Sequence, residues 1–128
     1  MTELNFIQTE KAPAAIGPYS QAVQVGNIIY FSGQIPLDPK TMQIVDGGIA
    51  EQTKQVLQNI ASMLEAARIS KERVLKTTIF LTDMNDFSTF NTMYEDFFGK
   101  HKPARSTVQV AALPKGALIE IEMIGHRE

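Results

Sequence analysis

The sequence predicts an α+β domain in which two helices pack on one face of a mixed β-sheet. Three observations lead to this fold class: strand-like segments toward both ends of the chain, two segments with helical periodicity between them, and a β-branched segment that separates the helices. The predicted order is strands, helix, strand, helix, strands, and two helices can cover only one face of such a sheet. A length of 128 residues fits one ordinary domain, so we expect residues 1–128 to form a single unit.

The first half of the chain predicts a loop, a hairpin and a helix. Residues 12–20 contain two prolines and a glycine, which are typical of an irregular loop. Residues 21–25 and 28–34 have strand-like composition on either side of Gly26-Asn27, and this arrangement predicts a β-hairpin. From residue 50 to residue 67 apolar side chains recur at helical spacing, so we expect an amphipathic helix.

A strand is predicted next, because residues 74–82 are rich in β-branched side chains. Successive side chains of a strand point to opposite faces, so the alternation places Leu75, Thr77, Ile79 and Leu81 on one face.

The last third of the chain predicts a helix and two strands. The helix is expected to begin near Asn85 or Asp86, either of which can cap it, and to end at Gly99. Its aromatic side chains recur at helical spacing, and such a stripe indicates core packing. Residues 105–110 and 118–124 have the pattern of two closing strands.

Composition excludes several classes of site. Twelve Lys and Arg against fourteen Asp and Glu give a net charge of -2, which argues against a protein built to neutralise nucleic-acid phosphates. The chain has no cysteine, so a disulfide, a thiolate zinc site and a cysteine nucleophile are excluded. The two histidines are not at metal-ligand spacing, and no phosphate-binding loop or serine-hydrolase motif is present. The N-terminal sequence lacks the features of a signal peptide, so we expect a cytoplasmic protein without a membrane span.

The closing strand predicts an unusual second face for the sheet. Leu118, Glu120, Glu122 and Ile124 alternate onto the side that the two helices leave open. Apolar residues interleaved with carboxylates indicate a face that is partly buried against another subunit. This pattern favours an oligomer with a site at its interface.

Two charged residues are candidates for chemistry, although each also has an ordinary interpretation. Arg105 opens a strand after a locally cationic segment, where its planar guanidinium can bind a carboxylate or phosphate through two hydrogen bonds. Glu120 lies among apolar neighbours in mid-strand, where desolvation increases the basicity of a carboxylate. Taken singly, Arg105 is equally a surface arginine and Glu120 an ordinary solvent-facing glutamate.

Taken together, four ordered blocks of sequence resemble the RidA (YjgF) family of imine deaminases. The block at residues 103–121, PARSTVQVAALPKGALIEI, is similar to the family signature. Residues 14–20, 31–36 and 76–87 are similar to its other blocks, in the same order, so the resemblance spans essentially the whole chain.

The resemblance implies a chorismate-mutase-like α+β fold and a homotrimer with pockets at its subunit interfaces. It also implies hydrolysis of reactive 2-imino acids, which pyridoxal-phosphate enzymes release as enamines, to 2-oxo acids and ammonia. No cofactor or metal is implied. The expected partner is therefore a small 2-imino or 2-oxo acid.

Roles carried over by position follow from the resemblance. Arg105 would hold the substrate carboxylate, and Glu120 would orient or activate water. The other implied pocket residues are Tyr19, Ser32, Gly33, Asn91 and Thr107, with Tyr19 and Asn91 expected from different subunits. Many family members have cysteine where this chain has Thr107, which leaves the role intact if that position acts through its backbone carbonyl.

Two other functions are also compatible with the sequence. A regulatory module would bind a 2-oxo acid in the same interface pocket without accelerating imine hydrolysis. Endoribonuclease activity or translation inhibition is also associated with the family, but the net charge of -2 and the absence of a catalytic histidine pair argue against it.

Overall fold

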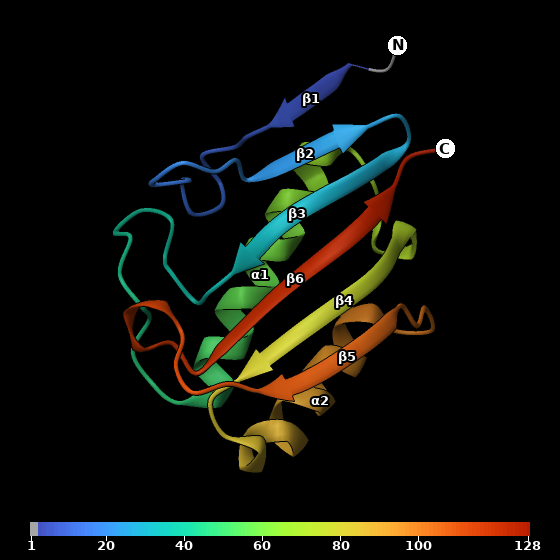
Figure 1. Cartoon of the computed structure of the whole chain (residues 1–128). Coiled ribbons are helices and arrows are strands. Elements are labelled where there is room, and N and C mark those ends of the chain that lie inside the picture. Colours follow the sequence, from blue (N-terminus) through green and yellow to red (C-terminus); the bar gives the residue numbers. More distant parts are fainter. Residues whose placement is uncertain (1–2) are drawn as a thin grey trace.

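The computed structural model describes residues 3–128, which form two helices and one six-stranded sheet (Figure 1). The strands are β1 (Leu4–Ile7), β2 (Ala22–Val25), β3 (Ile28–Gln34), β4 (Val74–Leu81), β5 (Ala104–Gln109) and β6 (Ile119–His126). The helices are α1 (Ile49–Ala67) and α2 (Phe87–Phe98), and short 3₁₀ turns are η1 (Lys71–Arg73), η2 (Met84–Asp86) and η3 (Pro114–Gly116).

The sheet has the strand order β1-β2-β3-β6-β4-β5. Its neighbouring strands run antiparallel except β4 and β5, which are parallel, so the sheet is mixed. Both helices lie behind the sheet in Figure 1 and leave the other face without helices. These observations confirm the predicted α+β class and the predicted placement of both helices.

The hydrophobic core lies between the helices and the sheet. Helix α1 contributes buried apolar side chains at helical spacing, and α2 contributes Phe90, Tyr94 and Phe98, whose successive ring centroids are 5.4 and 4.8 Å apart. The sheet contributes alternating residues such as Ile79 and Ile121. Burying each such side chain stabilises the fold by roughly 1.5–3 kcal/mol, and the aromatic pairs add to that.

Strand β1 was not predicted from the sequence. It pairs antiparallel with β2, with Phe6 opposite Val23. Only Ile7 of its four residues is buried, so the segment shows too little alternation for its pattern to reveal a strand.

The predicted shared face of Leu75, Thr77, Ile79 and Leu81 was wrong at one position. Val74 is fully buried, whereas Leu75 is 44% exposed. The pairing with β6 is irregular between Val74 and Lys76, because these residues oppose the consecutive residues Gly125 and Ile124. Leu75 is therefore an extra residue in a β-bulge, which moves its side chain off the face shared by the following alternate residues.

The predicted start of α2 is confirmed, because Asp86 is its N-cap residue, but the capping hydrogen bond expected from that side chain is not formed. Helix α2 is preceded by the turn η2, and Asp83 caps that turn by accepting a hydrogen bond from the backbone N–H of Asn85 at 2.9 Å. Asp86 has helical dihedral angles and makes no capping hydrogen bond through its side chain. The acidic residue that begins this segment lies two to three positions earlier than the sequence pattern indicated.

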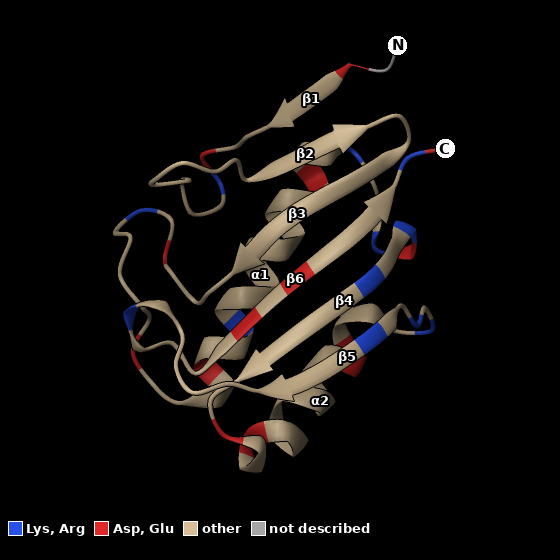
Figure 2. Ribbon diagram, viewed as in Figure 1, with Lys and Arg blue, Asp and Glu red and all other residues tan. Residues whose placement is uncertain are grey.

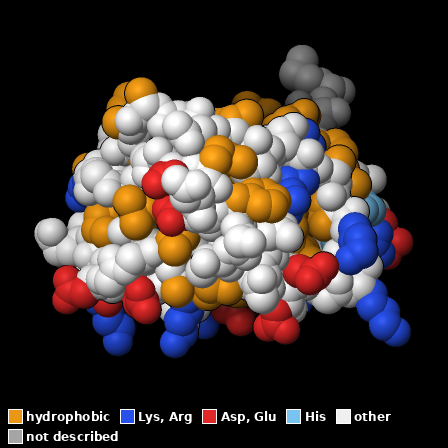
Figure 3. Space-filling view, turned by 90° about the horizontal axis from the view of Figure 1, so that it is seen from below, with side chains coloured by type: hydrophobic (Ala, Val, Ile, Leu, Met, Phe, Trp, Pro, Cys, Tyr) orange, Lys and Arg blue, Asp and Glu red, His pale blue; other side chains and the backbone are white. Residues whose placement is uncertain are grey.

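The helix-free face of the sheet exposes large apolar side chains. Phe6, Tyr30 and Val108 are 61%, 51% and 43% exposed on it, and β6 contributes the carboxylates of Glu120 and Glu122 (Figure 2). Figure 3 shows the end of the molecule that lies at the bottom of Figure 1. Charged side chains gather along one edge of this view, and hydrophobic side chains are exposed elsewhere in it. The predicted mixture of apolar and acidic residues on the open face is thus confirmed.

Within residues 3–128, neither helix combines the length and hydrophobicity needed to cross a membrane.

Candidate active site

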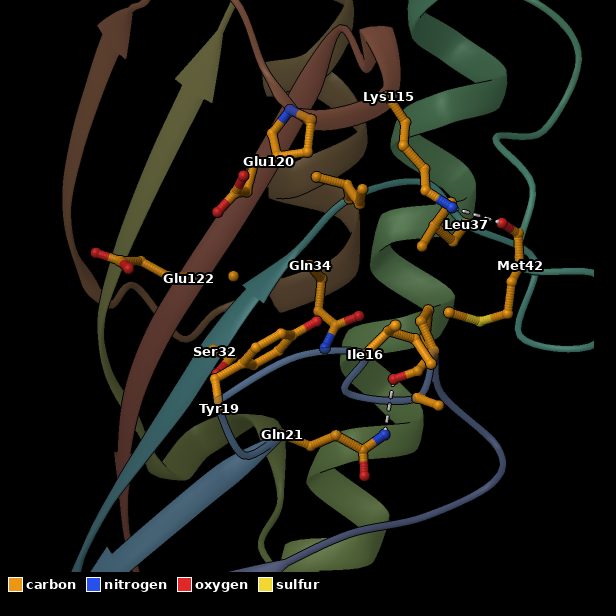
Figure 4. Close-up of a pocket in the computed structure, with 15 residues that line it drawn as sticks. Ile16, Tyr19, Gln21, Ser32, Gln34, Leu37, Met42, Lys115, Glu120 and Glu122 are labelled. Carbon is orange, nitrogen blue, oxygen red and sulfur yellow. Dashed lines mark hydrogen bonds between the residues drawn. The ribbon is translucent and has the colours of Figure 1, made fainter.

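An open cavity of about 730 Å³ lies beside the ends of β3 and β6 (Figure 4). Four of the predicted site residues line it: Tyr19, Ser32, Gly33 and Glu120. They come from the loop before β2, from β3 and from β6, so the sheet and its connecting loop bring together residues that are about a hundred positions apart.

Glu120 faces the cavity because its neighbours in β6 face the core. Ile119 and Ile121 are buried under the helices, and alternation turns the side chain between them to the opposite side. Burial raises the pKa of the Glu120 carboxyl, and repulsion by the negative charge of Glu122 raises it further. A carboxylate in this position is a stronger base than one in water.

Gly33 permits the close approach of the Glu120 carboxylate. A Cβ atom at position 33 would overlap a carboxylate oxygen of Glu120. Any other residue at Gly33 would therefore displace the acidic group from its place beside β3. This is a spatial requirement, and glycine satisfies it because it has no side chain.

Ser32 presents its side-chain oxygen to the cavity as a hydrogen-bond acceptor. Its hydroxyl donates to the backbone carbonyl of Ser20 at 2.5 Å, and its backbone N–H donates to the carbonyl of Gln21 at 2.9 Å. Because its one hydroxyl hydrogen is used, the Ser32 oxygen can accept a hydrogen bond from an N–H or O–H group in the cavity.

Gln21 anchors the loop that carries Tyr19. Its buried side-chain amide donates to the carbonyl of Pro13 at 2.8 Å and to that of Thr9 at 3.0 Å, and its carbonyl accepts from the N–H of Thr9 at 2.8 Å. This anchoring residue was not predicted from the sequence. A polar residue at the start of a strand gives no signal of such long-range contacts.

Arg105 and Asn91 form a second, separate group. Arg105 lies opposite Thr77 on β5, and its guanidinium donates to the side-chain carbonyl of Asn91 on α2 at 2.7 Å. The guanidinium also lies over the rings of Tyr94 and Phe87, 5.0 and 5.5 Å from their centroids. The hydrogen bond to Asn91 uses one of the five N–H donors of the Arg105 guanidinium. The aromatic rings hold the guanidinium in place, so that its other N–H groups can bind an anion.

The aromatic support of Arg105 is itself fixed by a buried hydrogen bond. The hydroxyls of Tyr94 and Thr77 lie 2.7 Å apart, and burial raises the pKa of Tyr94. Arg105, Asn91 and Tyr94 line a cavity of about 440 Å³. The sequence did not predict that aromatic side chains of α2 support Arg105, because their helical repeat indicates only packing in the hydrophobic core.

Thr107 lies on the same side of β5 as Arg105, two residues further along the strand. It is aligned with the buried Ile79, and its hydroxyl is buried without a hydrogen-bond partner among residues 3–128. Thr107 does not line the cavity that contains Glu120.

The two groups lie on opposite faces of one sheet. Arg105 shares the helix side with Thr77 and Tyr94, whereas Glu120 shares the open side with Phe80, its partner across the strands. A single chain therefore does not bring together the two residues to which the sequence assigned the chemistry. Within the described part of the chain, no cluster of three or more histidine, aspartate or glutamate side chains is placed to hold a metal ion.

The fold and the site together define an α+β protein whose sheet carries a basic carboxylate in an open cavity on one face and an anchored arginine on the other. The chain belongs to the Endoribonuclease L-PSP family, the RidA (YjgF) family of the sequence resemblance, whose model matches residues 9–127.

Similar proteins extend this assignment. The mouse 2-iminobutanoate/2-iminopropanoate deaminase is 55% identical over 118 residues, which cover 92% of this chain and 87% of the mouse protein. The crystal structure of RidA from the Antarctic bacterium Psychrobacter is 48% identical, covers 96% of this chain and 99% of its own, and has a TM-score of 0.92. The crystal structure of E. coli TdcF with bound serine is 43% identical, covers 97% and 99%, and has a TM-score of 0.91.

Proposed function

We propose that this protein is an enzyme, a deaminase that hydrolyses 2-imino acids to 2-oxo acids and ammonia. The observation that carries the proposal is the Glu120 carboxylate, desolvated in an open cavity beside Ser32 and Gly33. The name of the mouse relative supports the substrate class, because that protein is called a 2-iminobutanoate/2-iminopropanoate deaminase. Serine bound to TdcF supports a ligand with the size of a small amino acid.

The proposed reaction needs a base and no cofactor. Glu120 accepts a proton from water as the water oxygen bonds to the electrophilic carbon of the C=N group, whose nitrogen is protonated. The nitrogen of the tetrahedral intermediate then takes this proton from Glu120 and is expelled as ammonia. The hydroxyl of the intermediate gives its proton to the freed Glu120 carboxylate as the carbonyl of the 2-oxo acid forms, and the ammonia takes up that proton, which restores the carboxylate. A positioned base of this kind contributes about 10²–10⁴-fold to the rate.

Ser32 and Arg105 have complementary parts in this proposal. The Ser32 oxygen accepts a hydrogen bond from the substrate N–H, because its own hydrogen is bound to Ser20. The Arg105 guanidinium binds the substrate carboxylate in the two-pronged manner typical of arginine. A charge-assisted hydrogen bond contributes roughly 1.5–3 kcal/mol.

The proposed site is assembled from two subunits of a homotrimer with the chorismate-mutase-like arrangement. One subunit supplies Arg105 and Asn91, and its neighbour supplies the cavity with Tyr19, Ser32, Gly33 and Glu120. Support comes from the placement of the two groups on opposite faces and from the apolar side chains exposed on the helix-free face. A head-to-tail interface closes into a ring when its rotation returns to the first subunit, as it does after three steps in the proposed trimer.

An imine-hydrolysis assay tests the proposal. An amino-acid oxidase generates the imine in the cytoplasm-like conditions where we expect the protein to act, and semicarbazide traps the imine that remains. Added protein should lower semicarbazone formation in proportion to its concentration. Binding of a 2-oxo acid without faster hydrolysis would instead identify a sensor, and cleavage of RNA with neither would identify a nuclease.

A further inference from the structure

The cavity has an apolar side that the proposed reaction does not use. Ile16 comes from the loop before β2, and Leu37 and Met42 come from the loop after β3; the three lie together in Figure 4, away from Glu120 and Glu122. Leu37 is buried, whereas Ile16 is 73% exposed. A volume of about 730 Å³ lies in the range of ~300–1,000 Å³ that is typical of pockets for drug-sized ligands, so 2-iminopropanoate would occupy a small part of it.

The loop that carries Leu37 and Met42 is fixed from inside the protein. Asn59 of α1 is 1% exposed, and its amide donates to the carbonyls of Leu37 at 3.0 Å and Ile35 at 3.3 Å. Leu37 also forms an isolated antiparallel bridge with Ile44. The loop between residues 35 and 44 is therefore held to the core, and it presents its side chains from a defined position.

Met42 is connected to a second loop by one hydrogen bond. The ammonium group of Lys115 in η3 donates to the carbonyl of Met42 at 3.1 Å, as Figure 4 shows. Met42 and Lys115 have φ angles of 60° and 58°, in the left-handed region that residues with a side chain rarely adopt. Such strained residues concentrate at ligand sites. Here both lie in the two loops that close the apolar side of one cavity.

We propose that Met42, positioned by Lys115, determines which imine side chains this protein prefers. Its thioether contacts apolar side chains longer than the methyl group of 2-iminopropanoate, and the flexible, polarizable methionine side chain suits several shapes. This inference rests on the proposed function, because the C=N carbon must lie at Glu120 for the substrate side chain to reach Met42. The preferred class is therefore 2-imino acids with apolar side chains longer than a methyl group.

Met42→Ala tests the proposal directly. The ratio of kcat/KM for the leucine-derived imine to that for the alanine-derived imine should fall about tenfold, as expected when an apolar pocket loses contact with a side chain. Lys115→Met should lower the same ratio by a smaller factor, since it removes only the hydrogen bond that positions Met42. Met84→Ala, which truncates an exposed methionine outside the cavity, should leave the ratio unchanged.

A binding measurement separates this proposal from the catalytic one. Calorimetry with 4-methyl-2-oxopentanoate and with pyruvate compares the same two side chains without turnover. Met42→Ala should markedly weaken the binding of 4-methyl-2-oxopentanoate and leave that of pyruvate nearly unchanged. If the wild-type protein hydrolyses no imine but shows this selective loss of binding, the side-chain assignment stands and the catalytic proposal fails. An equal loss for both ligands, no loss, or no binding of either overturns the assignment of Met42.

Discussion

Arg105 and Glu120 lie on opposite faces of the same sheet. Arg105 is aligned with Thr77 on the helix side, and Glu120 is aligned with Phe80 on the open side. A substrate held by Arg105 of one chain therefore cannot reach Glu120 of that chain across the sheet. If both residues act on one molecule, they belong to different subunits, and this requirement has a direct test.

Mixing two impaired variants, Arg105→Ala and Glu120→Gln, should restore activity. Arg105→Ala subunits keep the Glu120 cavity, and Glu120→Gln subunits keep the arginine group. When equal amounts are unfolded and refolded together, a site between neighbours receives both intact groups in about one quarter of cases in a head-to-tail ring. Imine hydrolysis should recover to about that fraction of the wild-type rate.

The complementation experiment includes its own control for assembly. Light scattering should give about three times the chain mass of 14.2 kDa for the wild type and for each variant. A trimeric mixture without activity would show that the two residues do not share a site between subunits. A monomer would exclude the interface altogether.

Glu120→Gln should reduce turnover with little change in ligand affinity. The amide keeps the shape and hydrogen bonding of the side chain but cannot accept the proton of the attacking water. We expect kcat to fall by about 10²–10⁴-fold while the dissociation constant of a 2-oxo acid changes little. Steady-state kinetics and calorimetry on the same preparation measure the two effects, and an unchanged kcat would mean that another group activates water.

Glu122→Gln should shift the acid limb of the pH–rate profile to lower pH. Burial and, to a smaller degree, Glu122 raise the pKa of Glu120, whose ordinary value is 4.5. The base acts when ionised, so the rate rises with pH through this pKa. Removing the neighbouring negative charge stabilises the ionised form and lowers the pKa, and hence the pH of half-maximal kcat.

Two charged groups near Glu120 are the same in the wild type and in Glu122→Gln. Lys115 lines the same cavity, and in the proposed trimer Arg105 of the neighbouring subunit also faces the carboxylate. Both remain in the variant, so the difference between the two profiles isolates the charge of Glu122. Glu72→Gln, at an exposed position in η1, should leave the profile unchanged, and a shift toward higher pH in Glu122→Gln would contradict the assignment.

Arg105→Lys should damage activity nearly as much as Arg105→Ala. Lysine keeps the positive charge but loses the planar fork and its fit against Tyr94 and Asn91. Losing one charge-assisted bond corresponds to a roughly ten- to hundredfold fall in kcat/KM. Near-normal activity of Arg105→Lys would reduce the residue to a general electrostatic role, and near-normal activity of Arg105→Ala would remove it from the site.

The sequence by itself determined the secondary-structure elements that carry strong local patterns. The apolar repeat of α1, the aromatic repeat of α2 and the alternation of β6 are properties of neighbouring residues, so both helices, five of the strands and the acidic open face were predicted. Family blocks in the sequence also singled out the candidate site residues. The two features that differ from the prediction, the face of Leu75 and the side-chain capping bond of α2, depend on a bulge and a 3₁₀ turn, which insert residues into regular patterns without a local signal.

The tertiary structure alone decided which of these residues meet. Which face each residue occupies depends on strand order and register, and these separate Arg105 from Glu120 although both lie in one sequence block. The hydrogen bond from Lys115 to Met42 joins residues far apart in the chain, and the anchoring of the loop by Asn59 does the same. Such contacts follow from how the whole chain packs, because polar groups bond to partners that the fold brings within reach, and a buried group such as the Asn59 amide must find one.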